Sequence, residues 1–261
     1  MIRSRASSAL ATFGLMLALC VAPEARGPLV MPLPDTARMA LISNEVAFRD
    51  QAAAEGDSSA GWHVSSGSLF GGGAFLWSGK PDGNRPNFDS SLSTGSAVLR
   101  ATTAQATFQD VTVSFDLHVN QFVQTPRTGF RSFDGVHLLL RYRSEMETYA
   151  VSVFRRDGKV ALKKKVPGGV SNGGTYFTLA EGQMPSIVTG KNQWRQMQAT
   201  ISGHRSVRLS LRIDGHSVLT ALDRGAGGIA PISYGAVGIR GDNCDFYLFG
   251  LDIRDESQNF S

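Results

Sequence analysis

The segment that decides the fold reads DGVHLLLRYRSEMETYAVSVFRRDGKVALKKKV over residues 134–166. Apolar and polar residues alternate along it, and two turn-like interruptions, at Ser144–Glu147 and Asp157–Gly158, divide it into three runs. A period of two is typical of β-strands that bury one face in a core. The segment therefore predicts three consecutive antiparallel strands joined by tight turns.

The two turns also predict which side chains share a face of the sheet. A two-residue turn at Asp157–Gly158 pairs Ser152 with Lys163, and the register of the first turn agrees with that assignment. The predicted core face contains Val136, Leu138, Leu140, Tyr142, Tyr149, Val151, Val153, Val160, Leu162 and Val166. The predicted polar face contains His137, Leu139, Arg141, Arg143, Ser152, Phe154, Arg156, Lys163 and Lys165.

The rest of the chain repeats this pattern of short β-rich runs and turn residues. Val111–Val119 alternates strictly, Ala199–Asp214 does so again, and Asp214–Gly215 predicts a tight hairpin turn. Residues 66–95, rich in Gly and Pro, are expected to form a long loop. Because no long window has a helical period, we predict an all-β fold, a sandwich of two antiparallel sheets.

The N-terminus has the pattern of an export signal. Arg3 and Arg5 precede an apolar run from Ala9 to Ala22, which is shorter than the roughly 20 residues of a membrane span. We expect a signal peptide over 1–27 and a secreted, extracellular protein without stable membrane insertion after cleavage. The expected mature parts are a flexible leader at 28–40, one domain at 41–254 and a polar tail at 255–261.

Charge and cysteine content narrow the function classes. Without Arg3, Arg5, Arg26 and Glu24, the formal net charge falls from +4 to about +2, so a chain-wide basic charge for nucleic acid is absent. Cys244 is the one cysteine after residue 27, which rules out an internal disulfide in the mature chain. We expect Cys244 to be a small buried apolar residue.

Several stretches carry a resemblance to a known family of secreted bacterial proteins. They are Asn44-Glu45, Trp62–Phe70, Asp134–Tyr142, Arg155–Gly158, Lys163–Gly169 and Gly238–Asn243. That family is assigned to the concanavalin A-like lectin/glucanase fold, and the resemblance covers about residues 42–254. It implies a jelly-roll sandwich with a concave sheet, the surface on which relatives of this fold bind or cleave polysaccharides.

The leading functional prediction is a secreted carbohydrate-binding, lectin-like domain. Arginine and lysine side chains recognise carboxylate and sulfate groups, so the partner expected on the concave face is a polysaccharide or other glycan, with an anionic one favoured by the basic residues. The predicted ligand-binding residues are His137, Arg141, Ser152, Phe154, Arg156, Lys163 and Lys165. A merely solvated basic face is the alternative, because Lys and Arg are mostly exposed.

Two further functions stay open. A polysaccharide-cleaving enzyme, either a glycoside hydrolase or a lyase, is one of them, with Asp116, His118 and Asp134 as candidate catalytic residues. The Glu-x-Asp-x-x-Glu strand of laminarinase-type glucanases is absent, and Glu145 and Glu147 fall in a turn instead. The other is a structural or adhesive exported domain.

A metal site is considered near the last strand. Asp242, Asn243, Asp245 and Asp252 supply oxygen atoms of the kind that Ca²⁺ prefers, and a structural calcium ion is the one cofactor considered. A plain Asx turn explains the same residues without a metal, and both readings stay open.

Overall fold

The computed structural model describes residues 31–44, 61–79, 97–124, 129–189 and 192–256. The expected signal peptide at 1–27 lies outside the described residues, as do 80–95 of the expected long loop and 257–261 of the expected tail. Within the described residues, no helix is long and apolar enough to cross a membrane.

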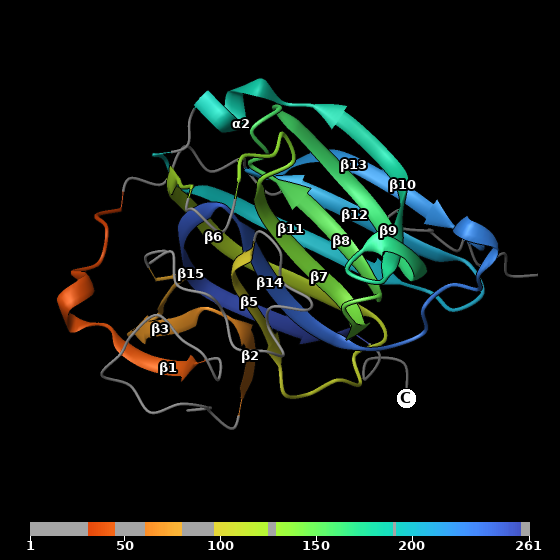
Figure 1. Cartoon of the computed structure of the whole chain (residues 1–261), viewed down its shortest axis with the longest axis horizontal. Helices are drawn as coiled ribbons and strands as arrows, with labels where there is room; N and C mark the ends of the chain where they lie inside the picture. The colour runs from red at the N-terminus through yellow and green to blue at the C-terminus, as the bar shows by residue number, and fades with distance from the viewer. Residues whose placement is uncertain (1–30, 45–60, 80–96, 125–128, 190–191, 257–261) are drawn as a thin grey trace, which may run out of the picture.

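The described strands form two antiparallel sheets that lie one over the other (Figure 1). The spatial order of the eight-stranded sheet is β1 (Ala40–Asn44), β3 (Ser68–Gly72), β4 (Phe75–Trp77), β15 (Cys244–Asp255), β6 (Val111–Phe122), β11 (Arg195–Ser202), β12 (Val207–Ile213) and β13 (His216–Asp223). That of the seven-stranded sheet is β10 (Gly174–Gln183), β9 (Lys159–Ser171), β8 (Glu147–Val153), β7 (Gly135–Ser144), β14 (Ala236–Asp242), β5 (Ala97–Thr103) and β2 (Trp62–Ser66).

Among the described residues, helical structure is confined to three short segments. They are η1 (Thr36–Arg38), α2 (Pro185–Thr189) and η2 (Ala226–Gly228). Segment α2 lies where the chain leaves β10 for β11, and its Ile187 is fully buried in the core. The chain crosses between the sheets after β1, β2, β4, β5, β6, β10, β13 and β14, so strands distant in sequence become neighbours. The predicted all-β jelly-roll sandwich of two antiparallel sheets is confirmed.

One apolar core fills the space between the sheets. Alternating residues of β6, β11 and β12 meet alternating residues of β7, β8 and β9 there, as expected for strands with one buried face. Cys244 belongs to this core and is fully buried, as the sequence predicts. The predicted turn at Asp214–Gly215 is also present, with Ile213 paired to His216.

The hairpin registers of residues 134–166 differ from the prediction. Strand β8 ends at Val153, so five residues rather than two connect it to β9, and Ser152 pairs with Ala161 instead of Lys163. A bulge also interrupts the pairing of β7 with β8 between Leu140 and Ser144. Ser144 still pairs with Glu147, as the predicted turn requires. Beyond the bulge, and between β8 and β9, the register moves by two residues, which keeps the alternation of faces over most of the segment.

The expected loop at 66–95 is wrong in its first part. Residues 68–72 and 75–77 form strands β3 and β4, which join the eight-stranded sheet. Turn residues Gly73 and Ala74 connect them, and Gly73 has a φ of 60°. The glycines that suggested a loop therefore belong to a tight hairpin.

Candidate functional site

A pocket opens on the outer face of the seven-stranded sheet. Its volume is about 170 Å³, small beside the roughly 300–1,000 Å³ of typical small-molecule sites, so it holds one compact ligand group. The residues that line it are Phe133, His137, Leu139, Ala150, Ser152, Lys163, Ser171, Tyr176, Arg240 and Asp242.

Two rows of side chains across the sheet form the floor of this pocket. Strand register places Arg240, His137 and Ser152 next to one another on β14, β7 and β8. The second row contains Leu139, Ala150 and Lys163. These residues face outward because their sequence neighbours, such as Leu138 and Val151, enter the core.

The walls come from segments at the edge of this floor. Phe133 precedes β7, Ser171 ends β9, and Tyr176 lies on β10 after the Asn172–Gly173 turn. Asn172 and Gly173 both have positive φ, as a tight hairpin turn requires. The pocket therefore has aromatic walls and a mostly polar floor.

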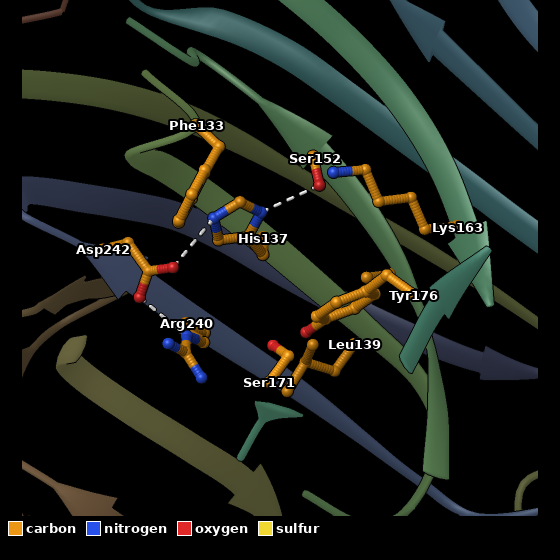
Figure 2. Close-up of a pocket in the computed structure, with 10 residues that line it drawn as sticks. Phe133, His137, Leu139, Ser152, Lys163, Ser171, Tyr176, Arg240 and Asp242 are labelled. Atoms are coloured by element: carbon orange, nitrogen blue, oxygen red, sulfur yellow. Dashed lines mark hydrogen bonds and ion pairs between the residues drawn. The ribbon is translucent and has the colours of Figure 1, made fainter. Parts of the chain in front are cut away.

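Four of the residues that line the pocket form a continuous chain of polar contacts (Figure 2). The Ser152 hydroxyl lies 2.8 Å from His137 Nδ1, and His137 Nε2 lies 3.3 Å from Asp242 Oδ2. Arg240 Nε donates a hydrogen bond of 2.7 Å to Asp242 Oδ1. Three neighbouring strands thus hold a serine, a histidine, a carboxylate and a guanidinium in one line.

Burial and charge set the protonation states in this chain. Burial lowers the pKa of His137, and Arg240 and Lys163 lower it further, although Asp242 acts in the opposite direction. Burial also acts to raise the pKa of Asp242, but the Arg240 guanidinium and the contact with His137 outweigh it and hold that pKa well below its usual range. At neutral pH the site therefore contains a neutral imidazole beside an ionised carboxylate.

Two lysines flank the ring of Tyr176. Lys163 Nζ lies 5.8 Å and Lys165 Nζ 5.0 Å from the ring centroid, the range of a cation–π contact. Within the described part of the chain, neither ammonium forms a hydrogen bond or an ion pair with a carboxylate. Burial lowers the pKa of both lysines, that of Lys165 to about 8.

The structure brings together three of the seven predicted ligand-binding residues. His137, Ser152 and Lys163 line the pocket, and Lys165 lies beside it against Tyr176. Arg156 follows β8 in the loop, where it contacts Phe122, Phe130 and the Asp134 carboxylate. It does not line the pocket.

The predicted position of Arg141 on the polar face is wrong. Arg141 has a φ of 48° within the β7 bulge, so its fully buried side chain turns to the opposite side of the sheet from Lys163. Its guanidinium donates hydrogen bonds to the carbonyl groups of Gln109, Ile232 and Gly203, at 2.6–2.9 Å, and to the Asp110 carboxylate at 3.2 Å. Arg141 therefore joins connecting segments at one end of the sandwich.

The bulge also moves the neighbour of Arg141. Tyr142, predicted to lie in the core, is only partly buried and interacts electrostatically with Arg100 and Arg240 on the outer side. The predicted position of Phe154 is also wrong, because Phe154 lies in the connection between β8 and β9 and has a positive φ. Its φ is 50°, and its side chain is fully buried in the apolar core instead of facing a ligand.

The candidate catalytic residues do not converge. Asp116 and His118 project from the outer face of the eight-stranded sheet, where His118 packs against Trp194 and Tyr247. Asp134 precedes β7 of the other sheet, is fully buried, and accepts hydrogen bonds from the Arg131 amide and Asn243 Nδ2. Asp116 and Asp134 therefore belong to different sheets and do not form the pair of carboxyl groups that a glycoside hydrolase needs.

The candidate metal ligands are also separated. Asp242 lies in the pocket against Arg240, and Asn243 Nδ2 donates to Asp134 and to the Gly129 carbonyl. Asp252 pairs with Arg254 on β15, and Asp245 accepts hydrogen bonds from Trp77 and Asn120. Among residues that the structure describes, no group of three His, Cys, Asp or Glu side chains could hold a metal ion.

Sequence reasoning missed the pocket role of several residues. The sequence places Leu139 on the polar face but predicts no ligand-binding role for it. Six other residues that line the pocket are not predicted as ligand-binding residues: Phe133, Ala150, Ser171, Tyr176, Arg240 and Asp242. The Asn172–Gly173 turn is a local signal that places Tyr176 on a hairpin with Lys165. No local signal places β14 beside β7, because that pairing joins segments about a hundred residues apart.

The arrangement also limits the chemistry available. A glycoside hydrolase of the usual kind needs two carboxyl groups, one of them protonated. Asp242 is the one carboxyl group among the described residues that line the pocket, and its lowered pKa keeps it ionised. The pocket instead offers a hydroxyl, a neutral imidazole, cations and aromatic rings.

Comparison with known proteins gives a likeness of fold alone. No protein-family model matches the chain, and no curated protein sequence matches it. Among solved structures, the carbohydrate-binding module CBM66 from Bacillus subtilis is similar at 13% identity and a TM-score of 0.46, over 74% of this chain and 95% of that one. The metal-free lectin I-B4 from Griffonia simplicifolia is similar at 11% identity and a TM-score of 0.45, over 74% and 92%. The exoplasmic/lumenal domain of VIP36 has 11% identity and a TM-score of 0.47, over 74% and 83%. Because a fold does not determine function, nothing about this pocket follows from these likenesses.

Proposed function

We propose that the protein binds carbohydrate in the pocket on the outer face of the seven-stranded sheet. The observation that carries this proposal is the combination of aromatic walls, from Tyr176 and Phe133, with a polar floor in a hollow of about 170 Å³. A sugar ring has an apolar face of C–H groups and an edge of hydroxyl groups. Aromatic rings pack against the former, and the floor supplies donors and acceptors to the latter.

The lysines support an anionic sugar as the ligand. Lys163 and Lys165 face the same side of the sheet and have no carboxylate partner among the described residues. Charge-assisted hydrogen bonds to a carboxylate or sulfate would satisfy a cation that is now partly desolvated. We therefore propose a uronic-acid or sulfated saccharide as the preferred ligand class.

Isothermal titration with a panel of neutral and anionic oligosaccharides tests the binding. Tyr176→Ala is expected to raise the Kd of the best ligand about tenfold, because it removes the aromatic wall. Tyr234→Ala is the matched control, since Tyr234 is about as exposed as Tyr176, at 44% against 39%, but does not line the pocket. Absence of binding by the wild-type protein to every saccharide, or equal losses in both variants, contradicts the proposal.

A second pair of variants tests the preference for anions. Lys163→Met is expected to weaken an anionic saccharide roughly tenfold or more, and a neutral one much less. Arg208→Ala removes an exposed cation from the eight-stranded sheet and is expected to change neither. If neutral and anionic ligands lose affinity equally with Lys163→Met, the ligand is not recognised by its charge.

We also propose that the protein is exported. The basic start and apolar run before Pro23 support this. Mass spectrometry of protein from culture medium is expected to find an N-terminus created by cleavage between Cys20 and Gly27. Retention of the complete chain inside the cell contradicts export.

A further inference from the structure

Three residues that line the pocket form a chain of contacts in space, in which Ser152 contacts His137 and His137 contacts Asp242 (Figure 2). We propose that this pocket hydrolyses short-chain acyl esters, with Ser152 as the nucleophile, His137 as the general base and Asp242 as the positioning residue. The order hydroxyl, imidazole, carboxylate is the arrangement that activates a serine for acyl transfer, and it is recognised by geometry rather than sequence position.

The contacts of His137 determine its tautomer. An ionised carboxylate only accepts hydrogen bonds, so the ring nitrogen that faces Asp242, Nε2, carries the proton. Nδ1 then has a free electron pair and accepts a hydrogen bond from the Ser152 hydroxyl at 2.8 Å. Nε2 lies 3.3 Å from Asp242 Oδ2 without hydrogen-bond geometry, and contacts of this kind in catalytic sites commonly tighten only when a substrate binds.

The surroundings of the three residues suit this chemistry. Burial and the cations of Arg240 and Lys163 favour the neutral imidazole, the form that can take a proton. Arg240 donates its hydrogen bond to Oδ1 of Asp242, so Oδ2 can interact with the imidazolium that forms on His137 during the reaction. Lys163, from the neighbouring strand, lines the same pocket, so a negatively charged oxygen that develops on the substrate lies near an ammonium group.

The shape of the pocket indicates the size of the acyl group. Ser152 is buried, and the apolar side chains of Leu139 and Ala150 lie beside it on the floor of the pocket. Because the hollow of about 170 Å³ is small, it limits the acyl group to a short chain. The alcohol part of the ester is a sugar hydroxyl, an assignment that rests on the proposed carbohydrate binding.

The reaction uses water as its one co-reactant. Ser152 Oγ bonds to the ester carbonyl carbon as its proton moves to His137 Nδ1, and the carbonyl oxygen becomes an anion near Lys163. When the carbonyl re-forms, the bond to the alcohol oxygen breaks, and that oxygen takes the proton from Nδ1. Water then attacks the acyl-serine by the same proton transfers, which releases the carboxylic acid and restores Ser152.

Hydrolysis of p-nitrophenyl acetate, followed as release of p-nitrophenolate, measures this activity. Ser152→Ala is expected to lower kcat/KM by about a hundredfold or more, whereas Ser210→Ala, a strand serine on the eight-stranded sheet, leaves it unchanged. Asp242→Asn is expected to lower kcat with little effect on KM and to shift the pH profile, which a structural role would not do. Equal rates for wild type and Ser152→Ala overturn the proposal.

A measurement on the wild-type protein covers the case in which Ser152→Ala fails to fold. Incubation with a fluorophosphonate is expected to add one label, and peptide mapping to find it on Ser152. An unlabelled Ser152 in folded protein overturns the proposal. Because saccharide binding is measured separately by titration, labelling without binding rejects the sugar as the alcohol, while binding without labelling rejects the esterase.

Discussion

Lys165 is a buried cation that forms no ion pair with a carboxylate among the described residues, although Glu145 and Asp242 interact with it electrostatically. Its side chain is 1% exposed beside the Tyr176 ring, and burial, followed by the charge of Arg240, lowers its pKa to about 8. Such groups destabilise a folded protein and are commonly kept for binding. We interpret Lys165 as a residue that an anionic ligand stabilises.

Replacement of Lys165 by methionine is expected to raise the free energy of unfolding at pH 7 by about 1–3 kcal/mol, because a buried charge is removed. Folded protein releases the Lys165 proton at a lower pH than unfolded protein does. The stability difference between variant and wild type therefore shrinks as pH rises from about 8 towards 10.5. Urea unfolding from pH 7 to 10 measures this, and a variant less stable than wild type at pH 7 contradicts it.

Arg141 has the opposite role, because every partner of its guanidinium belongs to the protein. Arg141→Ala is expected to cost about 3 kcal/mol or more, since it removes the guanidinium that donates to three carbonyl groups and leaves the Asp110 carboxylate with the Gly203 amide but without its cation. Arg143→Ala, two residues away at an exposed position, is the control and should change stability by about 0.5 kcal/mol or less. Equal effects in thermal unfolding would refute the assignment.

Arg141 and Phe154 also show where sequence-based prediction reaches its limit. Alternation of polar and apolar residues correctly assigns His137 and Ser152 to the outer face and Leu138 and Val151 to the core face. Successive side chains of a regular strand point to opposite faces of the sheet. A non-glycine residue with positive φ breaks that alternation, and the residue types Arg and Phe do not predict a positive φ. Arg141 and Phe154 both lie at such positions.

At the scale of elements, the β9–β10 hairpin shapes one wall of the pocket. Gly169 has a φ of 138°, and a Cβ atom there would lie 2.1 Å from Thr175 Oγ1 and 2.8 Å from the Gly174 carbonyl oxygen. Glycine at this position therefore permits the bend that brings Ser171 and Tyr176 to the pocket.

Gly169→Ala is expected to weaken saccharide binding roughly tenfold, because small displacements of positioning side chains are costly. Gly73→Ala is the control, since Gly73 also has positive φ but lies in the β3–β4 turn, far from the pocket in strand order. Calorimetric titration of both variants should find the loss of affinity in Gly169→Ala alone. Similar losses in the two would attribute the effect to backbone strain in general.

The order of strands that are distant in sequence explains why the sequence does not predict about half of the residues that line the pocket. The hairpins β7–β8 and β8–β9 join neighbours in sequence, so His137, Ser152 and Lys163 could be grouped from local turns. Arg240 and Asp242 reach the same surface only because β14 pairs with β7. That pairing depends on how the whole sandwich closes, which no local pattern encodes.

At the scale of the whole molecule, one continuous core joins the sheets and encloses Cys244. The thiol is fully buried, and burial raises its pKa well above the usual value. A disulfide reagent is expected to react with it only after unfolding. The absorbance of the released thiolate is expected to show no fast reaction of Cys244 when residues 28–261 are folded in native buffer, and one reactive thiol per chain in denaturant. A rapid reaction in native buffer contradicts a closed core.

The aromatic cluster of the eight-stranded sheet lies on the side of the sandwich opposite the pocket. It contains Trp77 and Trp194, with the Trp194 indole donating to the Met31 carbonyl, while Trp62 packs at the edge of the main core. No tryptophan among the described residues therefore lines the pocket. Indole emission will stay constant while a saccharide binds. A change in that emission will instead report that the N-terminal segment has left the opposite face.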